Sequence, residues 1–184
     1  MSSTASVQIR ESTPADAEPF HELLTANRDF LRPYEPTRPD SYFTPAGVRS
    51  ELQRAIADRA ADALYAFGVW ERATGHLVGR IALANVVRGA WQNATLGYFI
   101  GQRWGGRGYA TEAVRQILDF AFGEGNLHRI QAAVMPRNAA SVRVLEKNRF
   151  RFEGLAERYL QIDGVWEDHR VYSITAEERL PGSK

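Results

Sequence analysis

Leu96-Gly-Tyr-Phe-Ile-Gly-Gln-Arg-Trp-Gly-Gly-Arg-Gly-Tyr-Ala-Thr-Glu-Ala113 is the most informative segment of this chain. An extended apolar run ends in a glycine-rich turn, and a helical pattern begins directly after the turn. Backbone N–H groups at a helix start lack partners, and the helix dipole is positive there, so anions bind well. Glycines also let a phosphate come close to the backbone. The stretch therefore predicts a strand, a loop and a helix that together receive a phosphate or pyrophosphate.

Two well-known phosphate-binding loops do not fit this stretch. A Walker A loop needs Lys and then Ser or Thr after its last glycine, but Gly108 is followed by Tyr109. The Rossmann fingerprint needs Gly or Ala three residues after Gly108, and that residue is Thr111. What remains is the pattern Arg103-x-x-Gly106-x-Gly108.

The rest of the chain alternates between strand-like and helix-like patterns. Strands are expected over residues 7–11, 63–70, 77–87, 94–100, 128–135, 150–153, 159–162 and 165–174. Helices are expected over residues 16–31, 46–59 and 138–147, and from Tyr109 with a buried stripe of Ala110, Ala113, Val114, Ile117, Leu118 and Ala121. The Asp163-Gly164 pair predicts a hairpin turn. This order predicts an α+β fold, a mixed sheet with helices packed on it.

The length of 184 residues suits a single domain with a sizeable core. We expect that domain over residues 7–176, after a disordered N-terminus (residues 1–6) and before a C-terminal tail (residues 177–184). The prolines of residues 31–39 forbid a continuing helix. This proline segment, residues 31–39, is expected to be either a linker or part of a binding wall.

Composition bounds the class of function. Hydrophobic residues make up 44% and charged residues 24% of the chain, and the net charge is +1, which gives no general attraction to nucleic acid or membranes. Without cysteine there is no disulfide or thiolate site, and the four histidines lack the spacing of metal ligands, so we expect no metal. The N-terminus does not read as a signal peptide and no apolar run could span a bilayer, so we expect a cytoplasmic protein.

A second motif, Asn138-Ala-Ala-Ser141, opens a short helix. Together with the Arg-x-x-Gly-x-Gly loop it resembles the GNAT acetyltransferase superfamily. Within it the chain resembles the RimJ-type N-terminal acetyltransferases that modify ribosomal proteins, over residues 27–36, 85–89, 96–104, 128–130 and 159–169. The resemblance implies the GNAT fold: a central mixed, mostly antiparallel sheet with helices on both faces and splayed strands holding coenzyme A.

The resemblance also implies acetyl-CoA as the donor and direct attack of an amine on its thioester. Backbone amides of residues 106–110 are then expected to receive the pyrophosphate, and the strand around Phe99 and Ile100 to pair with the pantetheine arm. A backbone N–H near Phe99 is expected to polarise the thioester carbonyl, and Asn138 to bond the pantetheine. The donor-binding residues so implied are Phe99, Ile100, Arg103, Gly105, Gly106, Arg107, Gly108, Tyr109, Ala110 and Asn138.

The resemblance to RimL-type enzymes extends to only part of their catalytic residues. Ser141 stands where related RimL-type enzymes place a hydroxyl near the sulfur, so it is expected to protonate the leaving thiolate, to belong to the helix N-terminal turn, or both. Those enzymes use a carboxylate base where this chain has Leu160 and Gln161, and Glu35 and Glu157 are substitutes by location. A chain's α-amine titrates near pH ~8, against ~10.4 for lysine, so an N-terminal acceptor needs less help and water can suffice as base.

Several other polar and aromatic residues are expected to be structural. Glu112 complements the helix dipole, and His128 is structural. Tyr98, Trp104 and Trp166 are expected in the core or in a wall of the site.

The basic residues near the second motif have two interpretations. They form either a solvated face or the surroundings of the coenzyme's 3′-phosphate, and they comprise Arg137, Arg143, Lys147, Arg149 and Arg151. Arg149 stands where many relatives have Gly, so a positive φ at this residue would strain the backbone.

Three functions stay open at this point. The first is acetylation of a protein N-terminus that begins with Ala or Ser, as on a ribosomal protein; the second is acetylation of a small amine such as a polyamine, antibiotic or amino acid. The third is a non-catalytic module that binds coenzyme A or RNA, with possible association to the ribosome. Ser141 favours an enzyme, and the RimJ-like segments favour the first function. The sequence leaves the oligomeric state open.

Overall fold

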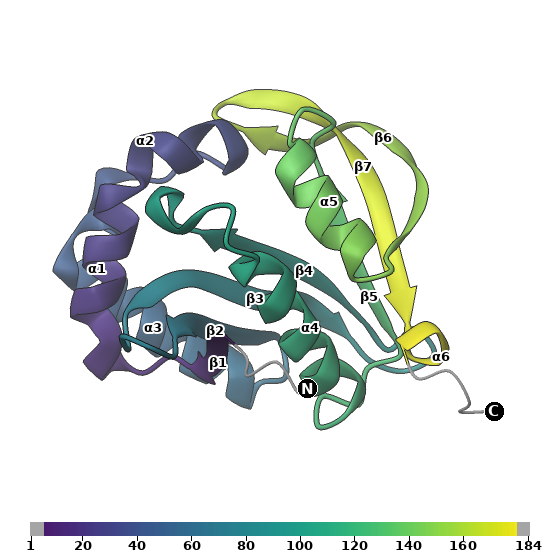
Figure 1. The fold of residues 1–184 in the computed structure, drawn as a ribbon, viewed down its shortest axis with the longest axis horizontal. Coiled ribbons are helices and arrows are strands. Elements are labelled where there is room, and N and C mark those ends of the chain that lie inside the picture. Colours follow the sequence, from purple (N-terminus) through teal and green to yellow (C-terminus); the bar gives the residue numbers. More distant parts are fainter. Residues whose placement is uncertain (1–5, 180–184) are drawn as a thin grey trace.

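Seven strands form one open sheet in the computed structural model, which describes residues 6–179 (Figure 1). The strands are β1 (Val7–Glu11), β2 (Leu64–Glu71), β3 (Leu77–Val87), β4 (Asn93–Ile100), β5 (Arg129–Val134), β6 (Arg151–Ile162) and β7 (Val165–Thr175). Their order is β1-β2-β3-β4-β5-β7-β6, and every neighbouring pair is antiparallel except β4 and β5. The expected α+β fold with a mixed, mostly antiparallel sheet is confirmed.

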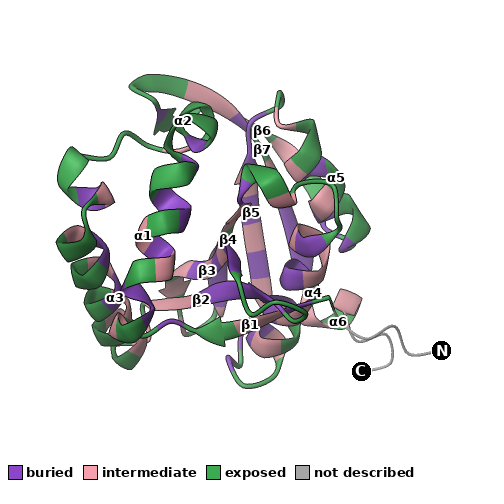
Figure 2. Ribbon diagram, turned by 60° about the vertical axis from the view of Figure 1, so that its left-hand side comes forward, coloured by how far each residue is buried: buried purple, intermediate pink, exposed green. Residues whose placement is uncertain are grey.

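Helices cover both faces of this sheet, as expected. They are α1 (Ala17–Ala26), α2 (Arg28–Leu31), α3 (Pro45–Ala60), α4 (Tyr109–Phe122), α5 (Ala139–Lys147) and α6 (Ala176–Arg179). The predicted stripe of α4 is the centre of one core, in which Val114, Ile117 and Leu118 are fully buried against the strands. A second core lies between α1, α3 and the other face of the sheet, around Trp70 and Leu77. In Figure 2 strands β2 to β5 are mostly buried or half-buried, whereas the outer turns of α3 are exposed.

The helix expected over residues 16–31 is interrupted, and that prediction was wrong in its continuity. Helix α1 ends at Ala26 and α2 begins at Arg28, with Asn27 between them. The buried Asn27 side chain donates to the Leu23 carbonyl (2.8 Å) and accepts from the Gln102 amide (2.8 Å). The break therefore ties the first helix to the loop that follows β4.

The strands expected over residues 150–153 and 159–162 are one strand, β6. Its pairing with β7 shifts register between Ala156 and Leu160, where Arg158 has a φ of 48° and donates its amide to Asp168. This β-bulge interrupts the alternation that a continuous strand shows in sequence. The Asp163-Gly164 turn is as expected, with positive φ at both residues (45° and 83°).

Most residues of the two expected terminal segments lie outside the described part of the chain. Of residues 1–6 the structure describes Ser6, and of residues 177–184 it describes residues 177–179, which belong to α6. Among the described residues, no helix has both the length and the apolar character to cross a bilayer.

Candidate active site

The site begins where β4 and β5 diverge. The two strands pair only over Asn93–Thr95 and Arg129–Gln131, although β4 continues to Ile100 and β5 to Val134. Beyond Thr95 the edge of β4 that faces β5 therefore carries backbone groups outside the sheet ladder. An extended, amide-bearing chain fits such an edge as an added strand would. Phe99 and Ile100 lie on this free part of β4, as the sequence predicted.

The glycine loop joins this open edge to α4. Gly106 and Gly108 have φ values of 75° and 81°, and a Cβ built on either would meet no atom within 4 Å. Gly108 precedes the first helical residue, and its carbonyl accepts the first intrahelical bond, from the Glu112 amide. The amides of the turn before Glu112 therefore point out of the helix start without intrahelical acceptors. The loop and the helix start are those expected from the sequence, and binding of an anion there stays a prediction.

A buried carboxylate holds the glycine loop in place through contacts with Arg107 and Tyr109. Glu71, at the end of β2, is 9% exposed and accepts from the Tyr109 hydroxyl and from Thr74 Oγ1 (2.6 Å). The Arg107 guanidinium lies 3.7 Å from the same carboxylate. These hydrogen bonds, that of Thr74 first, lower the pKa of Glu71, so it stays ionised. Tyr109 is thus a structural anchor of the loop through its side chain, while its amide belongs to the helix start.

The second motif caps α5 and places a hydroxyl opposite β4. Asn138 Oδ1 accepts from the Ser141 amide (3.1 Å), so Asn138 is the helix cap, as expected for a residue of this type. Ser141 Oγ does not serve as the cap. It lies 2.8 Å from the Tyr98 hydroxyl, which comes from β4. The motif therefore closes over the free part of β4.

Adjacent residues of β4 face the two sides of the sheet. Tyr98 packs with the core under α4, whereas Phe99 packs with the core under α1 and α3. Arg80 opposes Phe99 across the β3–β4 pair and donates to the Tyr42 hydroxyl (3.2 Å). Ser141 and the glycine loop thus lie on one side of β4, and a different set of side chains lies on the other.

That other side holds a cavity of about 450 Å³. Its lining comes from α1, α2, the proline segment, the short 3-10 helix Asp40–Phe43 and the hairpin turn, and it includes Leu24, Glu35, Arg38, Phe43 and Asp163. Asp163 donates its amide to the Glu35 carbonyl (3.2 Å) and accepts from Arg32 (3.0 Å). The proline segment is therefore a wall joined to the final hairpin, not a linker.

Glu35 is the perturbed carboxyl of this cavity. Burial raises its pKa above the usual range, while the Arg80 and Arg38 guanidiniums oppose that shift. A carboxyl whose pKa moves toward neutrality is better suited to accept a proton at working pH. Arg80 is paired with Phe99 on the sheet, and its charge acts on Glu35, so Glu35 lies on the Phe99 side of β4. Ser141 contacts Tyr98 and therefore lies on the opposite side.

Other candidates lie outside this arrangement. Glu157, Leu160 and Gln161 are exposed on the edge strand β6. Glu112 accepts from the Ser6 amide (2.9 Å), and His128 contacts Glu177 (2.8 Å), so both have structural partners.

The two tryptophans expected in the core or in a wall, Trp104 and Trp166, differ in burial. Trp104 is half-buried between the two cores. The Arg103 guanidinium stacks on its ring, 4.2 Å from the ring centroid. Trp166 was expected in the core or in a wall; it is 60% exposed, so it lies outside the core, and it lines a shallow surface hollow beside Arg137.

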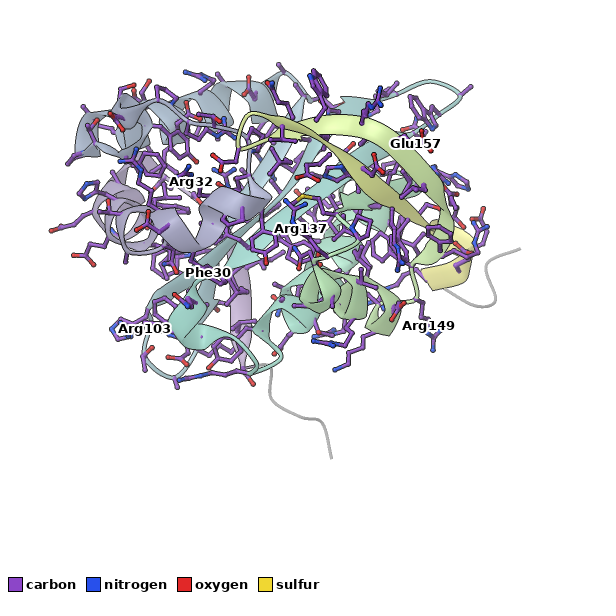
Figure 3. The ribbon with its side chains drawn as sticks, turned by 90° about the horizontal axis from the view of Figure 1, so that it is seen from above. Phe30, Arg32, Arg103, Arg137, Arg149 and Glu157 are labelled. Atoms are coloured by element: carbon purple, nitrogen blue, oxygen red, sulfur yellow. The ribbon has the colours of Figure 1, made fainter. Side chains whose placement is uncertain are left out.

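Arg137 lies apart from other members of the basic group. Arg137 contacts Glu167 (2.8 Å) at one end of α5, while Arg149 lies apart from it in Figure 3. Arg151 contacts Glu178 (2.8 Å). Arg149 has a φ of 65°, so the strain expected there is present.

Sequence reasoning missed two contacts of this site. Neither the anchoring of the loop by Glu71 nor the approach of Tyr98 to Ser141 has a signal in the local pattern, because each joins residues 38 or more positions apart. Among the described residues, no group of three or more His, Cys, Asp or Glu side chains could hold a metal ion.

Comparison with known proteins gives one consistent result. Residues 6–151 match the family described as acetyltransferase (GNAT) domain. The chain is 42% identical over 168 residues to the probable N-acetyltransferase YjcK of Bacillus subtilis strain 168, with 91% of this chain and 93% of that protein covered. It is 34% identical over 167 residues to the ribosomal protein uS5 alanine N-acetyltransferase of Escherichia coli K12, with 91% and 86% covered.

Solved structures agree. The ribosomal-protein-S5-alanine acetyltransferase of Vibrio fischeri superimposes with a TM-score of 0.90 at 31% identity, covering 97% of this chain and 98% of that one. Mycobacterium smegmatis RimJ in complex with CoA-disulfide gives a TM-score of 0.89 at 34% identity, covering 94% and 83%.

Proposed function

This chain belongs to the GNAT acetyltransferase family, and we propose that it transfers the acetyl group of acetyl-CoA to the α-amine of a protein N-terminus that begins with Ala or Ser. Two relatives that match nearly the whole chain are named as alanine N-acetyltransferases of a ribosomal protein. A ribosomal protein is therefore the proposed class of acceptor, and the cytoplasm, where such proteins are made, is the proposed location.

The donor side is proposed from the glycine loop and the free edge of β4. Amides of residues 106–110 receive the pyrophosphate at the start of α4, where the left-handed Gly106 and Gly108 leave open space. Phe99 and Ile100 offer backbone groups to the pantetheine arm, and the amide of one of them polarises the thioester carbonyl. Asn138 uses its oxygen on the Ser141 amide, so its side-chain nitrogen is the group proposed to bond the pantetheine.

The acceptor side is carried by one observation: a raised-pKa carboxyl, Glu35, lines a cavity whose walls are the proline segment and the hairpin turn. An N-terminal ammonium entering this cavity meets a group that can take its proton. The neutral amine then attacks the thioester carbonyl carbon from the Phe99 side of β4. On the opposite side, Ser141 Oγ gives its hydrogen to the departing sulfur.

The α-amine is the favoured acceptor on chemical grounds. With a pKa near ~8, roughly a tenth of α-amines are neutral at pH 7, whereas lysine at ~10.4 is neutral hundreds of times more rarely. A single carboxyl with a raised pKa, Glu35, therefore serves an α-amine better than a lysine side chain. A small first residue is proposed because two relatives that match nearly the whole chain are named as alanine N-acetyltransferases.

The test compares acetylation of three acceptors by mass spectrometry at pH 7. They are a peptide that begins with Ala, the same peptide with a blocked α-amine and an internal lysine, and spermidine. We expect the free Ala peptide to react fastest, and a Leu-starting peptide to react more slowly than it. Faster reaction of the lysine peptide would replace this proposal with a lysine acceptor, and faster reaction of spermidine with a small-molecule acceptor. Salt-sensitive RNA binding without any acetyl transfer would favour a non-catalytic module.

A further inference from the structure

Tyr98 lies at the point where β4 meets the start of α5. Its hydroxyl oxygen is 2.8 Å from Ser141 Oγ and 3.3 Å from the Ser141 carbonyl oxygen. The ring packs against the core under α4, and on the sheet Tyr98 is held opposite Ile81 of β3. Its hydroxyl is therefore fixed in place by strand pairing and by packing.

Two arrangements of the two hydroxyl hydrogens are possible. Tyr98 can donate to Ser141 Oγ, which leaves the Ser141 hydrogen free for a third atom. Alternatively, Tyr98 donates to the Ser141 carbonyl, and the Ser141 hydrogen turns back to the Tyr98 oxygen. An O–H···O bond is normally 2.5–3.0 Å long, so the 2.8 Å contact with Oγ is the better bond and the 3.3 Å contact with the carbonyl the poorer one. The carbonyl also has an acceptor role in the helix ladder of α5.

We propose that Tyr98 is a positioning residue for the reaction proposed above: its hydroxyl donates to Ser141 Oγ and thereby directs the Ser141 hydrogen toward the sulfur of the acetyl donor. This inference rests on the proposed function of the site. It assigns Tyr98 a role through Ser141, without contact with the substrate.

The reaction balances with this arrangement. The amine nitrogen forms a bond to the thioester carbonyl carbon, and the carbon–sulfur bond breaks with its electron pair passing to sulfur. The nitrogen loses one proton to Glu35 or water. The Ser141 hydroxyl gives its proton to the departing sulfur, coenzyme A leaves as the thiol, and the Ser141 oxygen takes up a proton from solvent.

The environment keeps Tyr98 a donor. Burial raises the pKa of the Tyr98 phenol to about 12, against a smaller lowering by the bond with Ser141. The phenol therefore remains protonated at neutral and mildly alkaline pH. A phenolate would instead accept from Ser141 and turn its hydrogen away from the sulfur.

The experiment is a double-mutant cycle with Tyr98→Phe, Ser141→Ala and the combined variant. Release of the free thiol of coenzyme A is followed at saturating acceptor, and kcat and the donor KM are measured separately. Tyr98→Phe should lower kcat roughly tenfold, the factor that one hydrogen bond contributes, with a nearly unchanged donor KM. In the Ser141→Ala background the same change should have almost no effect, because the hydroxyl it orients is gone.

Tyr65→Phe is the matched control. Tyr65 also has a hydrogen-bonded hydroxyl on a strand, 3.0 Å from Arg88, but it is a residue of β2 outside the site. It should keep the wild-type kcat, and thermal unfolding of all variants checks that each is folded.

Two kinetic outcomes overturn the role of Tyr98. They are an unchanged kcat in Tyr98→Phe, and an equal loss of kcat in both backgrounds, which would mean that Tyr98 acts independently of Ser141. A different result overturns the proposed acceptor: the wild-type enzyme does not acetylate the Ala peptide but acetylates another amine. The cycle is then run with that amine and still decides the role of Tyr98. Absence of transfer to every amine overturns both.

Discussion

Replacing Gly108 by Ala tests the glycine loop most directly. Gly108 has a φ of 81°, a conformation that costs an L-residue about 1–2 kcal/mol. No atom of the protein lies within 4 Å of the added Cβ, so packing adds no further cost. The Cβ instead projects into the space assigned to the pyrophosphate, beside the amides that would bind it. Loss of one or two charge-assisted bonds, about 1.5–3 kcal/mol each, weakens acetyl-CoA binding by roughly 100-fold.

A thermal shift assay measures this difference. At a concentration 100 times the wild-type Kd, acetyl-CoA stabilises the wild-type protein by about 2.7 kcal/mol, and a variant that binds 100-fold more weakly by about 0.4 kcal/mol. For a chain of this size, about 2–4 °C of Tm corresponds to each kcal/mol. We therefore expect a ligand-induced shift of roughly 5–10 °C for the wild type and about 1 °C for Gly108→Ala.

Gly89→Ala is the matched control, because Gly89 has a φ of 71° and equally open surroundings but lies in the turn between β3 and β4. Both variants should lose about the same stability without ligand, and only Gly108→Ala should lose the ligand-induced shift. A full shift in Gly108→Ala would refute the reasoning and place the phosphates elsewhere.

Three further predictions concern single residues. Ser141→Ala should lower kcat roughly 10²–10⁴-fold with little change in the donor KM, and a loss of only severalfold would leave Ser141 a structural residue of the helix start. Glu35→Gln should slow acetylation of the Ala peptide yet stabilise the fold at neutral pH. Because burial raises the folded-state pKa of Glu35, its contribution to stability is fully present below the unfolded-state pKa and is lost as the pH rises through the folded value. Chemical denaturation at acidic and neutral pH checks the sign, and equal stability of Glu35→Gln and wild type at neutral pH would contradict it. Arg149→Gly should raise the unfolding free energy by about 1 kcal/mol by relieving the positive φ, whereas Arg143→Gly, inside helix α5, should lower it by a similar amount; urea unfolding of the pair decides whether Arg149 is strained.

Much of the fold follows from local patterns. The stripe of α4, the alternation of β4 and the Asp163-Gly164 turn are each encoded within a few residues, because helix and strand periods and turn conformations are short-range properties. The same holds for the glycine loop, whose two left-handed residues are both glycines. The sequence also carried the family resemblance that the comparisons confirm.

The errors arose where a distant contact overrides the local pattern. Asn27 leaves the helical pattern because its side chain holds the amide of Gln102, which no helical periodicity records. Strand β6 looks like two strands because the bulge at Arg158 shifts its alternation.

The order of the elements, the glycine loop and the family can be inferred from the amino-acid sequence, since these depend on residues close together in the chain. The folded chain was needed to show that β4 and β5 part after Thr95, that Glu35 and Ser141 lie on opposite sides of β4, and that Tyr98 contacts Ser141. Those relations join segments far apart in sequence. They are fixed by how the two cores pack against the sheet, an energy shared among many side chains and absent from any single local pattern.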